Sequence, residues 1–250
     1  MRGGRSAAPV LGRVRWVLAT IIAWEVVQGL QPTGPPATGS WPVSPFDLLL
    51  LTVVPGLTAF AFVRLFLAVV QSGFGSLNTY TLTSNPWAWA FWVGLAVAMV
   101  GQGEHWAANT LNTALPEVVL HGGYGAQVEF LDEELGLWLL GGGFFLMTAV
   151  VMVLGQGATH RIVGGERGLL ALGSVLTYGF AVVFIGVEGQ QIVPAILGSG
   201  ILFGLAIRAL PPSEMSRDPV SLLVVPGVAL AGIILLAWGL IVGGQPTWPW

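Results

Sequence analysis

Long apolar stretches, separated by polar or glycine- and proline-rich turns, run through this chain from one end to the other. Crossing the hydrocarbon core of a bilayer takes about 20 mostly apolar residues, and seven stretches come close to that length. They are residues 15–30, 46–70, 87–108, 136–155, 168–187, 191–210 and 220–243. The pattern predicts an all-α polytopic integral membrane protein, a bundle of seven transmembrane helices that forms a single domain over residues 1–250.

Composition supports a membrane protein and argues against several functions. The chain is 54% hydrophobic and only 8% charged, whereas a soluble domain carries about a quarter charged residues. Cysteine is absent, which excludes disulfides, iron–sulfur clusters, thiolate zinc sites and cysteine nucleophiles. All nine basic residues are arginines, so a lysine Schiff base and a phosphate-binding P-loop are excluded. No basic surface suited to nucleic acid is expected.

Arginine placement predicts the orientation of the chain. Loops on the cytoplasmic side of a membrane are enriched in basic residues. With the N-terminus inside, every arginine falls towards the inner side: Arg2, Arg5, Arg13, Arg15, Arg64, Arg161, Arg167, Arg208 and Arg217. We therefore expect the N-terminus inside and the C-terminus outside, in the plasma (inner) membrane of a prokaryote.

The first apolar stretch also has the length of a cleaved signal peptide. It contains Trp24, Glu25 and Gln28, and no small-residue cleavage site closes it. These features favour a first helix that stays in the membrane.

The stretch from Gly101 to Glu134 is the main exception to the apolar pattern. It contains six of the twelve acidic residues and two of the three histidines. Most of it forms a predicted acidic outer loop at 109–135, and within this loop 118–135 has the mixture of apolar and acidic residues typical of an amphipathic surface helix. Its acidic part, residues 117–134, is a candidate docking site for a protein partner.

Glu25 is the clearest candidate for chemistry because a carboxylate inside a membrane helix is costly. The cost is about 2.5–3.5 kcal/mol on insertion scales, so such a group normally faces a cavity or a partner. Gln28 follows three positions later and therefore lies on the same helix face. A carboxylate at this depth is a common element of proton relays.

Two further helix ends bring polar groups to the same outer level of the predicted bundle. One holds Glu104, His105 and Asn109, and the other is the turn between the fifth and sixth stretches. The full candidate pocket consists of Glu25, Gln28, Glu104, His105, Asn109, Glu188 and Gln191. The alternative is that the polar helix ends are simply solvated and that Glu25 is hydrogen-bonded to a neighbouring helix.

A divalent metal is a candidate ligand of these polar groups. Imidazole and carboxylate side chains together suit such ions. The candidate ligands are Glu104, His105, His121 and Glu188. No paired metal-binding spacing such as HExxH supports the site, so it would have to assemble across helices.

Three functions agree with these observations. The first is a small carrier or channel for protons, cations or a small polar solute. The second is a membrane-embedded enzyme acting on a lipid or isoprenoid through Glu/His acid–base or metal chemistry, and the third is a structural subunit of a membrane complex. A water-filled path favours the first, an opening towards lipid favours the second, and a filled interior favours the third.

Overall fold

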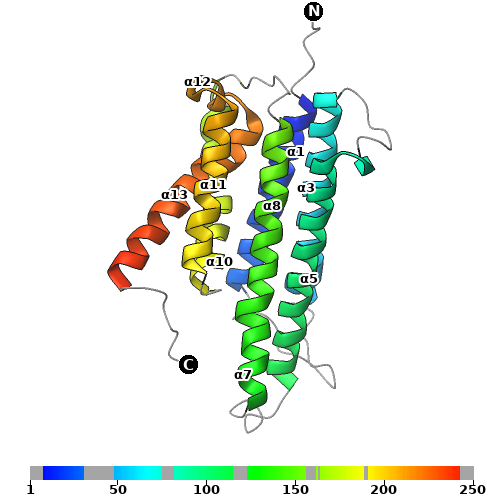
Figure 1. Cartoon of the computed structure of the whole chain (residues 1–250), viewed down its shortest axis with the longest axis vertical. Coiled ribbons are helices and arrows are strands. Elements are labelled where there is room, and N and C mark those ends of the chain that lie inside the picture. Colours follow the sequence, from blue (N-terminus) through cyan, green and yellow to red (C-terminus); the bar gives the residue numbers. More distant parts are fainter. Residues whose placement is uncertain are drawn as a thin grey trace, which may run out of the picture.

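The computed structural model describes residues 8–30, 48–74, 82–114, 123–155, 162, 164–188 and 191–242. These residues contain helices and no strand. The helices lie side by side along the long axis of the molecule, and successive long helices alternate in direction (Figure 1). We call the end at which α12 (Pro212–Met215) and the start of α1 (Ala8–Leu30) lie the N-terminal end of the bundle, and the end at which α7 (Gly123–Glu129) lies the opposite end.

The first half of the chain begins with α1 (Ala8–Leu30), followed by a π-helical turn η2 (Leu49–Val53) that continues directly into α3 (Val54–Phe74). Next come α5 (Pro86–Ala114) and α7 (Gly123–Glu129). A π-helical segment η3 (Phe130–Gly136) then leads from α7 into α8 (Leu137–Gly155). The second half begins with one continuous rod made of α9 (Glu166–Ser174), the π-helical η4 (Val175–Gly179) and α10 (Phe180–Glu188). It is followed by α11 (Ile192–Ala209), α12 (Pro212–Met215) and α13 (Pro219–Val242).

Among the described residues, four helical segments are long and apolar enough to cross a membrane. They are Val54–Gly73, Glu134–Gly155, Glu166–Val187 and Pro219–Val242. The expected all-helical membrane protein is confirmed at this level.

Three helices extend beyond the bounds expected from hydropathy. α1 begins at Ala8 rather than Arg15, and α5 continues to Ala114 rather than ending at 108. Much of the expected outer loop at 109–135 is helical, because α7 and η3 lead without a break into α8. A helix outside the hydrocarbon needs no apolar side chains, so the end of an apolar run does not mark the end of the helix.

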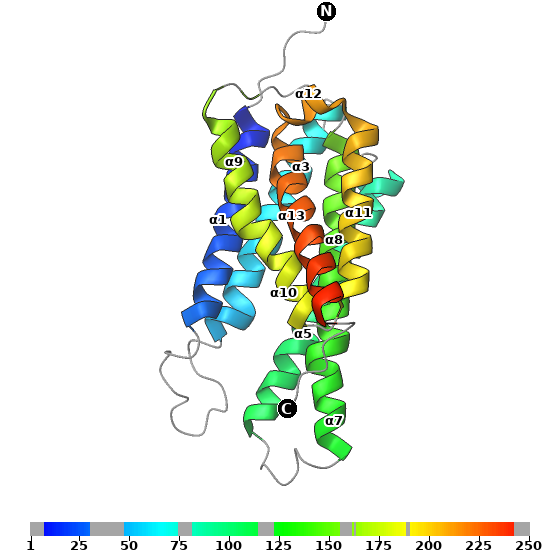
Figure 2. The same cartoon turned by 90° about the vertical axis from the view of Figure 1, so that its left-hand side faces the viewer.

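α5 and α8 form the closest helix pair of the described residues. A Cβ on Gly101 would clash with the backbone of Leu140, and one on Gly143 would clash with the backbone of Ala98. Small residues let the two backbones touch, as is common between membrane helices. The hairpin of α5 with α7 and η3 extends past the other helices at the opposite end (Figure 2).

A second close crossing joins α13 to the α9–η4–α10 rod. Pro226 lies inside α13, where it interrupts the helical hydrogen-bond ladder. The next amide, that of Gly227, donates a hydrogen bond of 3.0 Å to the buried hydroxyl of Ser174. A Cβ on Gly227 would lie 2.6 Å from the Ser174 carbonyl oxygen, so only glycine fits here.

Aromatic side chains fill the core between these helices. Phe66 of α3 stacks on Phe91 of α5 with ring centroids 4.1 Å apart. Phe144 of α8 contacts the ring of Tyr178 at 4.8 Å. The Tyr178 hydroxyl is fully buried and hydrogen-bonds to the hydroxyl of Thr148, which itself donates to the Phe144 carbonyl.

Candidate functional site

Glu25 lies on the face of α1 that packs into the protein. Val14, Leu18 and Ile21 are buried at helical spacing, and Glu25 continues this stripe four residues later. Its Oε1 atom is buried and has no hydrogen-bond partner among the described residues. Gln28 also lies within α1, but its side chain is outside what the structure describes.

Gln191 links the turn before α11 to the start of α8. Its side chain is buried, and its Nε2 donates to the Glu134 carbonyl oxygen at 3.3 Å. On the other side of the same segment, Gly136 packs so closely on α5 that a Cβ there would lie 3.1 Å from the His105 amide nitrogen. Two of the candidate residues, His105 and Gln191, therefore lie around the junction of η3 and α8.

Glu25 lies on a different helix from Glu104 and His105. The principal neighbours of α1 are α3 and α13, whereas α5 packs mainly on α8 and η3. Glu104 and His105 are half-buried on α5. The single outer pocket expected from the sequence stays a prediction. His105 and Gln191 lie around the η3–α8 junction, and Trp24 and Gln102, close in sequence to Glu25 and Glu104, line one apolar pocket.

The metal site remains a prediction. Within the described part of the chain, no three His, Asp or Glu residues lie close enough to hold a metal ion. His121 lies outside the described residues, and the side chains of Asn109 and Glu188 are not described although both backbones are helical.

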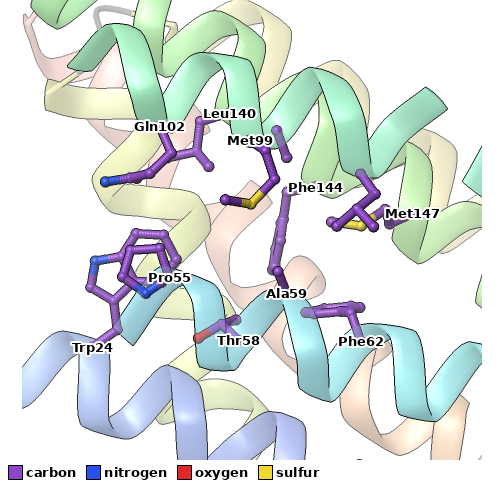
Figure 3. A pocket seen from close by; sticks show the side chains of 12 residues that line it. Trp24, Pro55, Thr58, Ala59, Phe62, Met99, Gln102, Leu140, Phe144 and Met147 are labelled. Atoms are coloured by element: carbon purple, nitrogen blue, oxygen red, sulfur yellow. The ribbon is translucent and has the colours of Figure 1, made fainter. Parts of the chain in front are cut away.

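An apolar pocket lies between α1, α3, α5 and α8 (Figure 3). Its volume is about 30 Å³, and apolar side chains such as Phe62, Met99 and Met147 form most of its wall. The polar contributions come from Gln102, Thr58 and the indole of Trp24. Sequence reasoning missed this pocket because its lining is indistinguishable from ordinary core residues in a single sequence.

Sequence reasoning also missed the polar contacts inside the membrane-spanning segments, which join Ser174 to Gly227 and Thr148 to Tyr178. The available signal was a small number of hydroxyl residues within apolar runs and a proline inside a long helix. Another buried hydroxyl, that of Ser199 on α11, has no hydrogen-bond partner among the described residues.

A buried acid lies at the N-terminal end of the bundle. Asp218 directly precedes α13, and its Oδ2 accepts a hydrogen bond of 2.7 Å from the Ser221 amide. Burial raises the pKa of Asp218 to about 6, and the hydrogen bonds from Ser221 act in the opposite direction. The geometry is that of an N-cap, which satisfies one of the free amides of a helix start.

Basic side chains are also held at this end. Arg15 forms an ion pair of 2.7 Å with Glu166, and Arg167 donates to the Ile162 carbonyl at 2.9 Å. Both partners of the ion pair are about half exposed, so its contribution to stability is small. The ion pair connects the start of α9 to α1.

Comparison with protein-family models, with curated proteins and with solved structures finds no match to this chain. Its function is therefore inferred from its own residues.

Proposed function

We propose that this protein is a small membrane carrier that moves a proton or a cation through binding at Glu25. The observation that carries the proposal is the buried, unpartnered Oε1 of Glu25 on the inward face of α1. An ionised carboxylate without a partner is strongly disfavoured in a low-dielectric interior. A bound proton or cation removes that cost, and a group that exchanges such a ligand is a transport site.

The proposal includes a chain that crosses the membrane seven times, with its N-terminus inside the plasma (inner) membrane of a prokaryote. The alternating direction of the long helices supports this arrangement (Figure 1). Arginines held near the N-terminal end, such as Arg15 and Arg167, support that end as the cytoplasmic side. The acidic residues of the α5–α7 hairpin, among them Glu104, then face outwards.

Helix irregularities support a moving carrier rather than an open channel. The π-helical η4 lies in the middle of one rod and crosses α13 at Pro226 and Gly227. Interrupted helices of this kind commonly form the sites and pivots of transporters. The interior of the described residues is filled by side chains such as Phe66 and Tyr178, which by itself favours the structural subunit over an open path. A carrier with this interior passes an ion only if its helices move.

The test is ion flux in liposomes that contain purified protein. A pH-sensitive dye and a sodium-sensitive dye, each trapped inside, report flux driven by an imposed membrane potential. We expect flux with the wild type, flux at least about tenfold lower with Glu25→Gln, and wild-type flux with Glu134→Gln as a control for loss of an exposed acid. Unchanged flux in Glu25→Gln would remove Glu25 from the transport site.

A second candidate function, a structural subunit that docks another protein through residues 117–134, is favoured by the hairpin of α5 and α7. The hairpin extends beyond the other helices, and on it Tyr124 is 72% exposed and Leu111 is 44% exposed. Large exposed apolar side chains on a projecting segment are typical of an interface. If this is the function, Tyr124→Ser reduces the size of the complex extracted in mild detergent and leaves liposome flux unaffected.

A further inference from the structure

Arg64 is a charged residue near the middle of an apolar membrane-spanning segment. The segment Val54–Gly73 is long and apolar enough to cross a bilayer, and α3 contains no other charged residue. About 14 Å of helix, at roughly 1.5 Å per residue, separate Arg64 from either end of this segment. Arginine side chains near a helix end extend to the headgroups, and Arg64 is near neither end.

The side chain of Arg64 lies on the outer surface of the protein without an acid beside it. Arg64 is exposed, and its guanidinium carbon lies 5.9 Å from the centroid of the Phe60 ring. In the described part of the chain Arg64 forms no ion pair, and the one found there joins Arg15 to Glu166. Charged residues in membrane spans almost always face the interior of a helix bundle, so an exposed one indicates that a further component covers it.

The guanidinium of Arg64 is directed away from the N-terminal end of the bundle. α3 runs towards that end (Figure 1), so Phe60, one turn earlier, lies closer to the opposite end. Long side chains on a helix lean back towards the start of the helix, and the contact with Phe60 agrees with this direction. The charge is held at the depth of the hydrocarbon, where a lipid phosphate in the headgroup layer is poorly placed to neutralise it.

The exposed face around Arg64 has the residue spacing of a contact between two helices. Val53, Leu57 and Phe60 are 49%, 50% and 60% exposed, and together with Arg64 they recur at intervals of four and three residues. This alternation places side chains in one line along a helix and is the pattern by which two helices pack. Gly56 lies on the same face, and a Cβ there would meet no atom within 4 Å, which leaves room for a second helix to approach closely.

A second copy of this chain would not neutralise Arg64. In a two-fold dimer whose axis runs along the membrane normal, equal residues of the two copies lie at the same depth, so each Arg64 would face another Arg64. These like charges repel, whereas a carboxylate forms two parallel hydrogen bonds with a guanidinium. Charge complementarity therefore favours a helix whose apolar span contains Asp or Glu.

We infer that α3 binds a membrane-spanning helix of another protein, and that a carboxylate in the middle of that helix pairs with Arg64. Apolar side chains of the partner helix pack on Phe60 and Leu57, one and two turns from the ion pair. The partner removes the cost of holding an unpaired charge in the hydrocarbon. Because this surface is on α3 and Glu25 is on α1, the inference does not depend on ion transport by Glu25.

The test uses two synthetic membrane-spanning peptides of leucine and alanine that differ only in a glutamate or a glutamine at the centre. The chain has no cysteine, so Ser213→Cys on α12 provides a single site for a donor dye, and the peptide carries the acceptor dye. Energy transfer in phosphatidylcholine liposomes measures association. We expect the glutamate peptide to bind at least about tenfold more tightly than the glutamine peptide, the usual effect of a hydrogen bond to a charged group. Equal binding would overturn the inference.

Variants of two exposed arginines show whether the preference for glutamate comes from Arg64. Arg64→Gln should bind both peptides equally, and Arg64→Lys, which keeps the charge, should retain part of the preference. Arg208→Gln removes an exposed arginine in the last turn of α11 and should keep the full preference. Size exclusion confirms that each variant is folded. A full preference in Arg64→Gln would place the glutamate elsewhere on the protein and overturn the inference.

A variant of Gly56 tests the docking face without changing any charge. Gly56→Leu fills the room beside Phe60, and no described side chain obstructs it. It should weaken the binding of both peptides and leave their ratio unchanged. Unchanged binding of both peptides would mean that they dock on another face, and would overturn the inference.

Two further measurements distinguish the other possible occupants of this face. Donor- and acceptor-labelled copies of the protein, mixed without peptide, should show no energy transfer beyond that of random mixing. Transfer that Gly56→Leu abolishes would assign the face to a second copy. Replacing part of the phosphatidylcholine with anionic phosphatidylglycerol should leave the preference for the glutamate peptide in place, and loss of that preference would assign Arg64 to a lipid phosphate. Either of these results would overturn the inference.

Discussion

Two acidic side chains in this protein, the buried Asp218 and the partly buried Glu25, have opposite surroundings. Asp218, at the N-terminal end of the bundle, accepts a hydrogen bond from the Ser221 amide at the start of α13. Glu25, on the inward face of α1, has a buried oxygen with no partner among the described residues. The same functional group is therefore part of a helix cap in one place and an unsatisfied charge in the other.

The difference separates a structural acid from a functional one. A helix start supplies free amides, so a carboxylate there gains hydrogen bonds that offset part of its loss of water. The middle of a helix supplies none, because its amides are already bonded to carbonyls within the helix. The buried oxygen of Glu25 has no such amide as a partner among the described residues, and this is why we propose transport at Glu25 and not at Asp218.

Neutralising each acid without changing its shape should have very different effects on ion flux. Glu25→Gln should reduce ion flux in liposomes at least about tenfold, since the group proposed to bind the ion is lost. Asp218→Asn should leave flux close to that of the wild type, because an amide oxygen still accepts the Ser221 hydrogen bond. Both variants should elute from size exclusion as the wild type does. Equal loss of flux in the two variants would show that the surroundings of the acids do not distinguish their roles.

The pH dependence of stability should come from Asp218 in a predictable direction. The folded protein holds the Asp218 proton up to a pKa of about 6, whereas the unfolded chain releases it near 3.8. Between these values the folded state binds more protons, so stability falls as pH rises from about 4 to about 6, by up to about 1.4 kcal/mol per pH unit. Thermal unfolding of detergent-solubilised wild type and Asp218→Asn measures this difference. The Asn variant should lose that part of the slope, and an unchanged slope would mean that another group titrates.

The hydrogen bond of the cap should have a smaller effect. Asp218→Ala removes the acceptor for the Ser221 amide, whereas Asp218→Asn keeps one. The Ala variant should therefore be less stable than the Asn variant by about 1 kcal/mol, the usual effect of losing an N-cap. Comparing these two variants with each other removes the charge from the measurement. Equal melting temperatures would mean that the 2.7 Å contact does not stabilise the start of α13.

Glu25 and Asp218 also show what could and what could not be predicted from the sequence. Glu25 could be identified because it interrupts an apolar run. Its surroundings could not, because they depend on which helices pack against α1. Asp218 lies in a short polar connection, where an acid that is solvated and an acid that caps a helix look the same. The helical fold was predictable from hydropathy, but the continuation of α5 to Ala114 was not, since hydropathy reports the membrane and not the helix.

The pocket between α3 and α5 and the crossing at Gly227 were beyond sequence reasoning for a related reason. Both depend on pairs of residues far apart in the chain, such as Phe62 with Phe144 in the pocket wall and Ser174 with Gly227 at the crossing. Each residue taken alone is ordinary for a membrane helix. Their contact partners become known only when the packing of the helices against one another is known.

The smallest effect on stability is expected at an acid that neither caps a helix nor has a buried oxygen without a partner. The side chain of Glu134 is exposed, and its contact with the Gln191 amide is made through its backbone carbonyl. Glu134→Gln keeps that carbonyl, so its stability should stay within about 0.5 kcal/mol of the wild type, as for most surface substitutions. Gln191→Ala, measured beside it, removes the donor and should cost about 1 kcal/mol, the usual net value of a hydrogen bond. If Glu134→Gln proved the more damaging of the two, the carboxylate itself would be holding the turn before α11 against α8, and the acid would belong with Asp218 among the structural carboxylates.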